Sequence, residues 1–114
     1  MFSKQLAKRF ARHWCEWNKV EYSNLLGTNC IMFQKDGSNC LEAITLDFIA
    51  NFEQEVCKRH ALAISQNILP DTCYVLYYEP LWNGKDYLLK AKAPDELTAR
   101  VEAVCRVIEK MDES

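Results

Sequence analysis

Glycine and the motifs of common enzyme families are scarce in this chain of 114 residues. It contains three glycines, and none of the motifs GxGxxG, GxxxxGK(S/T), GxSxG and HExxH occurs in it. Loops that hold phosphate groups through backbone N–H groups usually need several glycines, so nucleotide chemistry is not expected. The carboxylates fall at spacings normal for helix faces and single out no acid–base pair. The sequence therefore favours a non-enzymatic protein without a cofactor.

Long apolar runs are also missing. No run approaches the roughly 20 residues that a membrane-spanning helix requires, and no apolar segment typical of a secretory signal is present. Six cysteines stand at wide, irregular spacings, which indicates reduced thiols rather than a disulfide framework. Apolar residues make up 49% and charged residues 26% of the chain, as in globular proteins. We therefore expect a soluble, cytoplasmic protein with a single domain over residues 1–114 and no membrane association.

The first segment with a clear period is basic. Apolar residues recur at steps of three and four from Phe2 to Trp17, which predicts an amphipathic helix. Its opposite face gathers four candidate phosphate-binding residues: Lys4, Lys8, Arg9 and Arg12. The whole chain carries a net charge of −2 and the first 20 residues carry +4, so the remainder carries −6. Because that remainder repels polyanions, we interpret the basic face as an ordinary solvated one and do not expect nucleic-acid binding.

Two short patterns on predicted helices have metal-ligating or reactive residues. Cys57 and His60 lie one helical turn apart, and His13 and Cys15 are the other candidate zinc ligands. His13 is expected on the apolar side of its helix and Cys15 on the basic side, so the two cannot readily bind one ion. We expect no metal site and interpret His60 as a core histidine. Cys15 is predicted to be exposed among cationic side chains, which would lower the pKa of its thiol.

The middle of the chain begins with a predicted hairpin. Residues 20–27 are interpreted as a connection, and Asn29–Lys35 as a strand that enters an Asp36-Gly37 turn. Residues 39–45 form either the return strand or, with Ser38 as the cap, the start of a helix. We favour the strand because both sides of the turn are apolar enough to pair.

Two more helices are predicted from their periodicity. One extends from Leu46 to about His60 with Thr45 as its N-cap, and residues 61–65 either extend it or form a short strand. The other follows Pro94, which suits a first helical position. Its apolar stripe consists of Leu97, Val101, Val104, Ile108 and Met111.

The strongest hairpin signal is Asn83-Gly84, flanked by the apolar runs of the stretch from Cys73 to Ala93. Strict pairing across a two-residue turn places one set of strand residues on the core face: Tyr74, Leu76 and Tyr78, opposite Leu89, Ala91 and Ala93. The other face is mixed. Pro80 cannot donate to the ladder, so the strand is expected to stop near Glu79, before a wider loop.

These elements predict an α+β fold in the order α-β-β-α-β-β-α. It would be a two-layer domain in which about three helices pack on one antiparallel sheet of about four strands, built from two hairpins. Three helices cannot cover both faces of such a sheet, so part of it should stay exposed.

The predicted exposed surface is apolar and lies at the second hairpin. It comprises the candidate binding residues Tyr77, Leu81, Trp82 and Leu88. Such a patch marks a partner surface or a ligand cleft. The leading hypothesis is a small interaction module that forms a homodimer, or binds another protein, through this hairpin face. Two alternatives stay open: a small apolar-ligand binder with a pocket between helix and sheet, and a nucleic-acid binder that uses the first helix.

Overall fold

The computed structural model describes residues 3–80 and 88–112. Helices and strands alternate along them in the order α-β-β-β-α-β-β-β-α. Their bounds are α1 (Lys4–Asn18), β1 (Glu21–Leu26), β2 (Cys30–Lys35), β3 (Ser38–Ala43), α2 (Leu46–His60), β4 (Ala63–Ile68), β5 (Cys73–Tyr78), β6 (Leu89–Ala93) and α3 (Glu96–Asp112). The class is α+β, as the sequence predicts.

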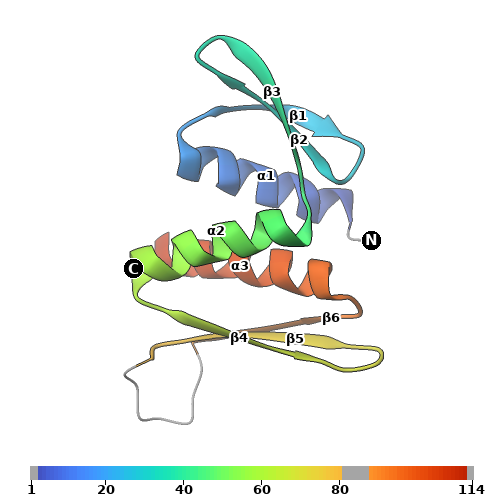
Figure 1. The fold of residues 1–114 in the computed structure, drawn as a ribbon, viewed down its shortest axis with the longest axis vertical. Coiled ribbons are helices and arrows are strands. Elements are labelled where there is room, and N and C mark those ends of the chain that lie inside the picture. The colour runs from blue at the N-terminus through green and yellow to red at the C-terminus, as the bar shows by residue number, and fades with distance from the viewer. Residues whose placement is uncertain (1–2, 81–87, 113–114) are drawn as a thin grey trace.

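The strands form two antiparallel sheets instead of the one predicted. Sheet A has the order β1-β2-β3 and sheet B the order β4-β5-β6, each with three strands. Figure 1 shows the helices as a layer between them, with sheet A above α1 and sheet B below α3. All three helices run in the same direction, so their C-terminal ends lie at one end of the molecule. The prediction of a single four-stranded sheet is therefore wrong.

The strand β1 was missed because a β-bulge interrupts its alternation. Its pairing with β2 shifts register between Tyr22 and Asn24, so apolar residues do not recur at every second position. Residues 20–27, predicted to be a connection, instead contain a strand that ends at Leu26, directly before Gly27. This glycine has φ +70°, a left-handed conformation that a residue with a Cβ adopts only with strain.

The Asp36-Gly37 hairpin is confirmed. Both residues have positive φ, 53° and 81°, as a type I′ turn requires. Ser38–Ala43 is the return strand, so the strand interpretation of this segment was right. The hydroxyl of Thr45 accepts the N–H of Phe48, which confirms the predicted N-cap of α2.

β4 is the second strand, after β1, that was not among the four predicted strands. The left-handed conformation of Ala61 (φ 54°) ends α2, and Ala63–Ile68 then pairs antiparallel with β5. Of the two alternatives left open for residues 61–65, the strand is therefore correct. β4 pairs with the edge of β5 that β6 does not use. The second hairpin therefore becomes part of a separate three-stranded sheet.

The face assignment of β5 is wrong by one residue. Tyr77 lies opposite Leu89 and Val75 opposite Ala91, whereas a two-residue turn at Asn83-Gly84 requires Tyr78 opposite Leu89. The buried face therefore consists of Cys73, Val75 and Tyr77. The turn itself lies outside the described residues, and β5 ends at Tyr78, close to the predicted end at Glu79.

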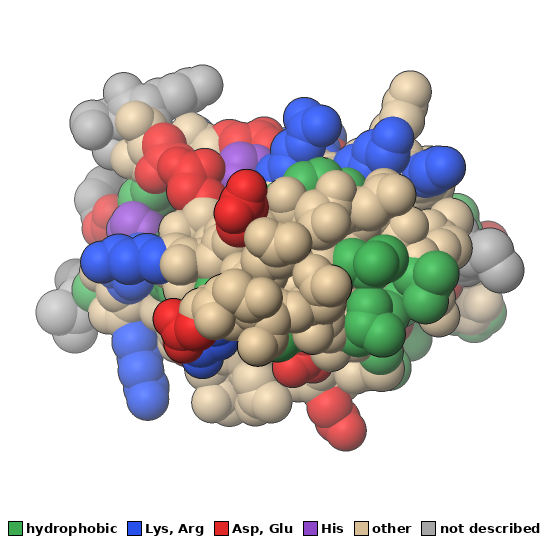
Figure 2. All heavy atoms as spheres, turned by 90° about the horizontal axis from the view of Figure 1, so that it is seen from above, with side chains coloured by type: hydrophobic (Ala, Val, Ile, Leu, Met, Phe, Trp, Pro, Cys, Tyr) green, Lys and Arg blue, Asp and Glu red, His purple; other side chains and the backbone are tan. Residues whose placement is uncertain are grey.

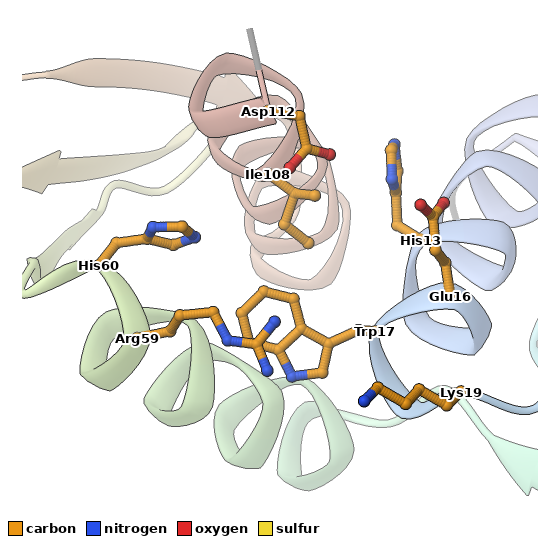
Figure 3. A pocket seen from close by; sticks show the side chains of 8 residues that line it. All are labelled: His13, Glu16, Trp17, Lys19, Arg59, His60, Ile108 and Asp112. Atoms are coloured by element: carbon orange, nitrogen blue, oxygen red, sulfur yellow. The ribbon is translucent and has the colours of Figure 1, made fainter. Parts of the chain in front are cut away.

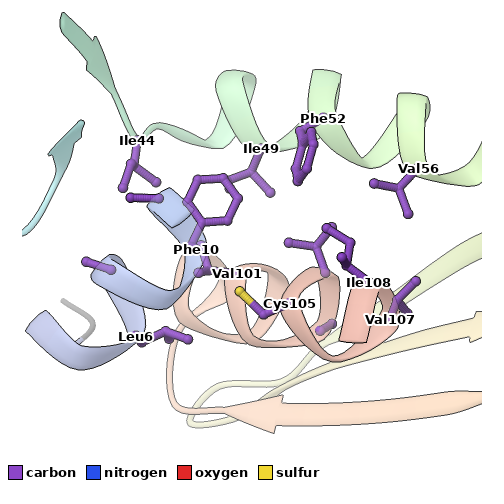
Figure 4. Close-up of a cluster of buried hydrophobic side chains, with 14 of the residues drawn as sticks. Leu6, Phe10, Ile44, Ile49, Phe52, Val56, Val101, Cys105, Val107 and Ile108 are labelled. Atoms are coloured by element: carbon purple, nitrogen blue, oxygen red, sulfur yellow. The ribbon is translucent and has the colours of Figure 1, made fainter. Parts of the chain in front are cut away.

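Helix α3 lies at the centre of the core. It packs on β5 and β6 on one side and on α1 and α2 on the other, so it buries more than the predicted single stripe. Figure 4 shows Phe10, Phe52 and Val101 meeting where the three helices pack together. The helix begins after Asp95, whose Oδ2 accepts the N–H of Thr98, and not at Pro94. None of the described helices is long and apolar enough to cross a membrane.

Candidate interaction surfaces

The basic face of α1 is partly neutralised by α3. The Arg9 guanidinium donates to both carboxylate oxygens of Glu109, at 2.7 and 2.5 Å, and to Glu102 Oε2 at 3.2 Å. His13 Nε2 lies 2.7 Å from Glu109 Oε2. The hydrogen bonds from Arg9 lower the pKa of Glu109 to about 2, and the same contacts raise the pKa of Arg9.

This arrangement removes Arg9 from the predicted phosphate-binding set. Its donors are occupied by two carboxylates, because Arg9 lies on the side of α1 that turns toward α3. Lys4, Lys8 and Arg12 are exposed, and Arg12 extends over the ring of Tyr22 at 5.8 Å from its centroid. The free cationic surface is therefore smaller than the sequence predicts.

The prediction that Cys15 is exposed is wrong. Its side chain is buried, and burial raises the pKa of the thiol to about 11, the opposite of the predicted direction. The cause is a second buried stripe of small residues on α1, Ala7, Ala11 and Cys15, next to the aromatic one. Their spacing of four residues was the sequence signal for this stripe. All six cysteines are free thiols.

The candidate metal ligands do not converge. Among the described residues no group of three or more His, Cys, Asp or Glu side chains could hold an ion. Instead of facing Cys57, the half-buried His60 packs edge-on against Trp17, with ring centroids 6.2 Å apart. His13 is held by Glu109.

A polar cleft of about 230 Å³ opens where the C-terminal ends of the three helices meet. Figure 3 shows Trp17 in this cleft with the Arg59 side chain across it; the guanidinium carbon lies 3.5 Å from the ring centroid. Lys19 and Arg59 are offset by Glu16 and Asp112, so the charges in the cleft are mixed. Its eight lining residues include no Ser, Thr or Cys nucleophile.

A groove of about 290 Å³ lies between α2 and β4, where an apolar-ligand pocket between helix and sheet was predicted as an alternative. Its lining includes Glu53 and Arg100, which form a buried ion pair with Nε–Oε distances of 3.1 and 3.2 Å. Burial raises the pKa of Glu53, and the guanidinium of Arg100 opposes this shift. A charged pair in its lining makes this groove a poor match for a purely apolar ligand.

Of the four predicted hairpin interface residues, the structure describes Tyr77 and Leu88. Tyr77 faces the core and is fully buried, so its predicted exposure is wrong. Leu88 is half-buried against the core, and its N–H donates to the carbonyl of Tyr77 at 2.8 Å. Leu81 and Trp82 lie outside the described residues. The register shift described above is the physical reason, since it exchanges the two faces of β5.

The outer face of sheet B instead carries Tyr74, Leu76 and Tyr78, all half-buried. Lys90 on the neighbouring strand extends its ammonium group over Tyr74, at 4.7 Å from the ring centroid. A lysine stem thus covers part of the apolar surface and keeps its charge in water.

The outer face of sheet A carries a bare apolar patch. Ile31 and Phe33 face α1, and Trp14 packs on Phe33 with ring centroids 5.0 Å apart. Alternation and register place the opposite set of side chains outward: Leu26, Cys30, Met32, Leu41 and Ala43, here called the sheet A patch. Figure 2 shows hydrophobic side chains gathered at one end of this face. Leu26 is 56% and Leu41 57% exposed.

The edges of the sheets differ as well. The bulge in β1 interrupts one edge of sheet A, and Lys90 and Lys92 flank Ala91 on the β6 edge of sheet B. β3 has neither a bulge nor a lysine or proline, and only Cys40 among its residues is even half-buried. No described strand pairs with its outer side.

Comparison with protein-family models, curated proteins and solved structures finds no match to this chain.

Sequence reasoning missed the sheet A patch, although a signal was present. The predicted Asp36-Gly37 turn already pairs Met32 with Leu41 and Cys30 with Ala43, on one face. The missing element was β1, which turns the hairpin into a sheet and adds Leu26 to the same face.

Proposed function

We propose that this protein is a small, non-enzymatic interaction module that self-associates through sheet A. The observation that carries this proposal is the sheet A patch, an apolar surface on the sheet face opposite α1. Large apolar patches are uncommon on monomeric proteins and are typical of interaction sites. The free thiols support a reducing, cytoplasmic setting.

The size of the patch limits what it can do alone. Fully burying a leucine side chain contributes about 1.5–3 kcal/mol, so burying the exposed halves of Leu26 and Leu41 in two copies contributes roughly 3–6 kcal/mol. A micromolar complex requires about 8 kcal/mol, after the cost of association has been met. Other groups of sheet A therefore have to contribute, and its unpaired strand edge is the nearest source.

The test is the mass of the protein in solution. We expect light scattering after size exclusion to show a mass that rises from monomer to dimer between low and high micromolar concentration. The double variant Leu26→Ser, Leu41→Ser should remain monomeric, with an unchanged far-UV circular dichroism spectrum. The matched control is Ile68→Ser, because this side chain is 60% exposed but lies in sheet B. A wild-type protein that is monomeric at high micromolar concentration would overturn the proposal.

A further inference from the structure

We infer that a second copy of this chain docks antiparallel on the free edge of β3, with Leu41 opposite Leu41 of the copy. Sheet A would then continue across a two-fold axis into a sheet of six strands. This inference rests on the proposed self-association and names its geometry.

The backbone of β3 offers one set of unpaired groups. The two-residue turn makes Lys35 and Ser38 the first bonded pair of the hairpin, and bonded residues then recur at every second position. At the other end of the hairpin, the N–H of Ile44 donates to the carbonyl of Asn29 over 2.7 Å, which agrees with the same alternation of bonded residues. The N–H and C=O groups that point away from β2 therefore belong to Asn39, Leu41 and Ala43.

This set is self-complementary in one register. With Leu41 opposite Leu41, Asn39 lies opposite Ala43 of the copy, and every outward N–H meets an outward carbonyl. The three residues of each copy then form six hydrogen bonds, because each donates once and accepts once. Centring the pair on Cys40 or on Glu42 keeps the faces matched but leaves one of the three residues in each copy unpaired.

The side chains favour the same register. The two Leu41 side chains meet on the outer face and join the two sheet A patches through Met32. Glu42 lies opposite Cys40 of the copy, so no like charges face each other, whereas centring on Glu42 would oppose two carboxylates. The competing free edge, β4, presents the polar side chains Ser65 and Asn67 on its outer face, beside the half-buried Leu76 and Tyr74 of β5.

Two leucines provide a matched test. Leu41→Lys places two ammonium groups at the two-fold axis, and we expect it to weaken the dimer about tenfold or more. Leu26→Lys changes an equally exposed leucine on the same face, but on β1 and away from the axis, so the dimer should persist. If both variants abolish the dimer, the patches pack face to face, which overturns the inference while the proposed function stands. If neither does, a surface outside the sheet A patch, such as the β4 edge of sheet B, is used, which overturns the inference and the proposed function together. A monomeric wild type overturns both as well.

Disulfide cross-linking tests the register itself, and it does not depend on the lysine variants folding. In this register Asn39→Cys mixed with Ala43→Cys should cross-link, and each variant alone should not. Leu41→Cys alone should cross-link, because opposite residues of a bonded pair lie about 5.5 Å apart between Cα atoms, within disulfide range. The background replaces the three half-buried cysteines by serine: Cys30, Cys40 and Cys57. A dimer in which Ala43→Cys cross-links to itself would contradict this register.

Discussion

The two sheets of this molecule are covered on their inner faces by different means and on their outer faces to different degrees. Sheet A rests on α1 through aromatic rings, with Trp14 against Phe33. Sheet B rests on α3 through a face that combines the buried ring of Tyr77 with smaller side chains such as Val75 and Ala91. On the outside, Lys90 covers Tyr74 in sheet B, whereas Leu41 in sheet A is exposed.

This difference is the reason for proposing self-association through sheet A and not through sheet B. Lysine stems over aromatic rings and lysines along an edge strand are common means of keeping a sheet monomeric. Sheet B has a lysine stem over an aromatic ring and lysines along its β6 edge. The sheet A patch and strand β3 have neither feature. The surface that lacks these features is the one expected to bind.

The largest effect is expected in the half of the molecule that contains sheet B. Glu53 of α2 is 3% exposed and binds Arg100 of α3, which packs on this sheet. Arg100→Met leaves the carboxylate buried without its partner, which should reduce the free energy of unfolding by about 3–5 kcal/mol. Urea denaturation followed by circular dichroism measures this.

The matched control is Arg106→Met, which removes an exposed ion pair of α3 with Glu102 (3.0 Å) and should cost about 0–1 kcal/mol. Combining Arg100→Met with Glu53→Leu should recover part of the loss, because the carboxylate that then lacks its arginine partner, Glu96, is partly exposed and not buried. If the two arginine variants lost equal free energy of unfolding, the buried Glu53 pair would contribute no more to stability than the exposed pair.

A smaller effect is expected at the joint between the two halves, where Glu109 of α3 binds Arg9 and His13 of α1. The folded-state pKa of Glu109, about 2, is lower than its ordinary value of 4.5. Its ionised form therefore stabilises the fold above about pH 4.5, and this contribution is lost as the pH falls toward 2. Because the side chain is 37% exposed and water screens the pair, we expect about 1 kcal/mol.

Chemical denaturation of Glu109→Gln at neutral pH and at about pH 3 measures this contribution. The difference from the wild type should be present at neutral pH and shrink at the lower pH. Glu16→Gln, a change at an exposed residue of α1, is the control and should show little difference at either pH. A difference for Glu109→Gln that does not change with pH would contradict the role of its ionised form.

Much of the fold follows from local signals in the sequence. Periodicity gave three helices, and Asp36-Gly37 gave one hairpin with its turn conformation, because both depend on neighbours in the chain. β1 could not be found in this way, since its bulge removes the alternation that marks a strand. The predicted face of β5 was wrong because the register of β5 with β6 is set by packing against α3 and not by the predicted turn residues.

The candidate surface was harder to predict than the fold. Whether Cys15 and Tyr77 are exposed depends on which element covers them, and that is a property of the tertiary arrangement. Arg9 was assigned to a free basic face, but its partner Glu109 lies 100 residues further along the chain. The sheet A patch could not be recognised without β1, the strand that was not predicted and that adds Leu26 to this face.

The smallest effect on stability is expected on the inner face of sheet B, at Tyr77. The hydroxyl of Tyr77 is buried and has no hydrogen-bond partner among the described residues, and burial raises the pKa of this phenol. Burying an unpaired hydroxyl costs free energy, so Tyr77→Phe should leave stability unchanged or raise it by up to about 1 kcal/mol. Tyr74→Phe, on the outer face of the same strand, is the control and should be near neutral. Thermal and urea unfolding of both variants measure this, and a loss of stability confined to Tyr77→Phe would show that its hydroxyl is paired. In that case the inner face of sheet B would contain a polar contact, and the contrast with the aromatic packing of sheet A would be larger.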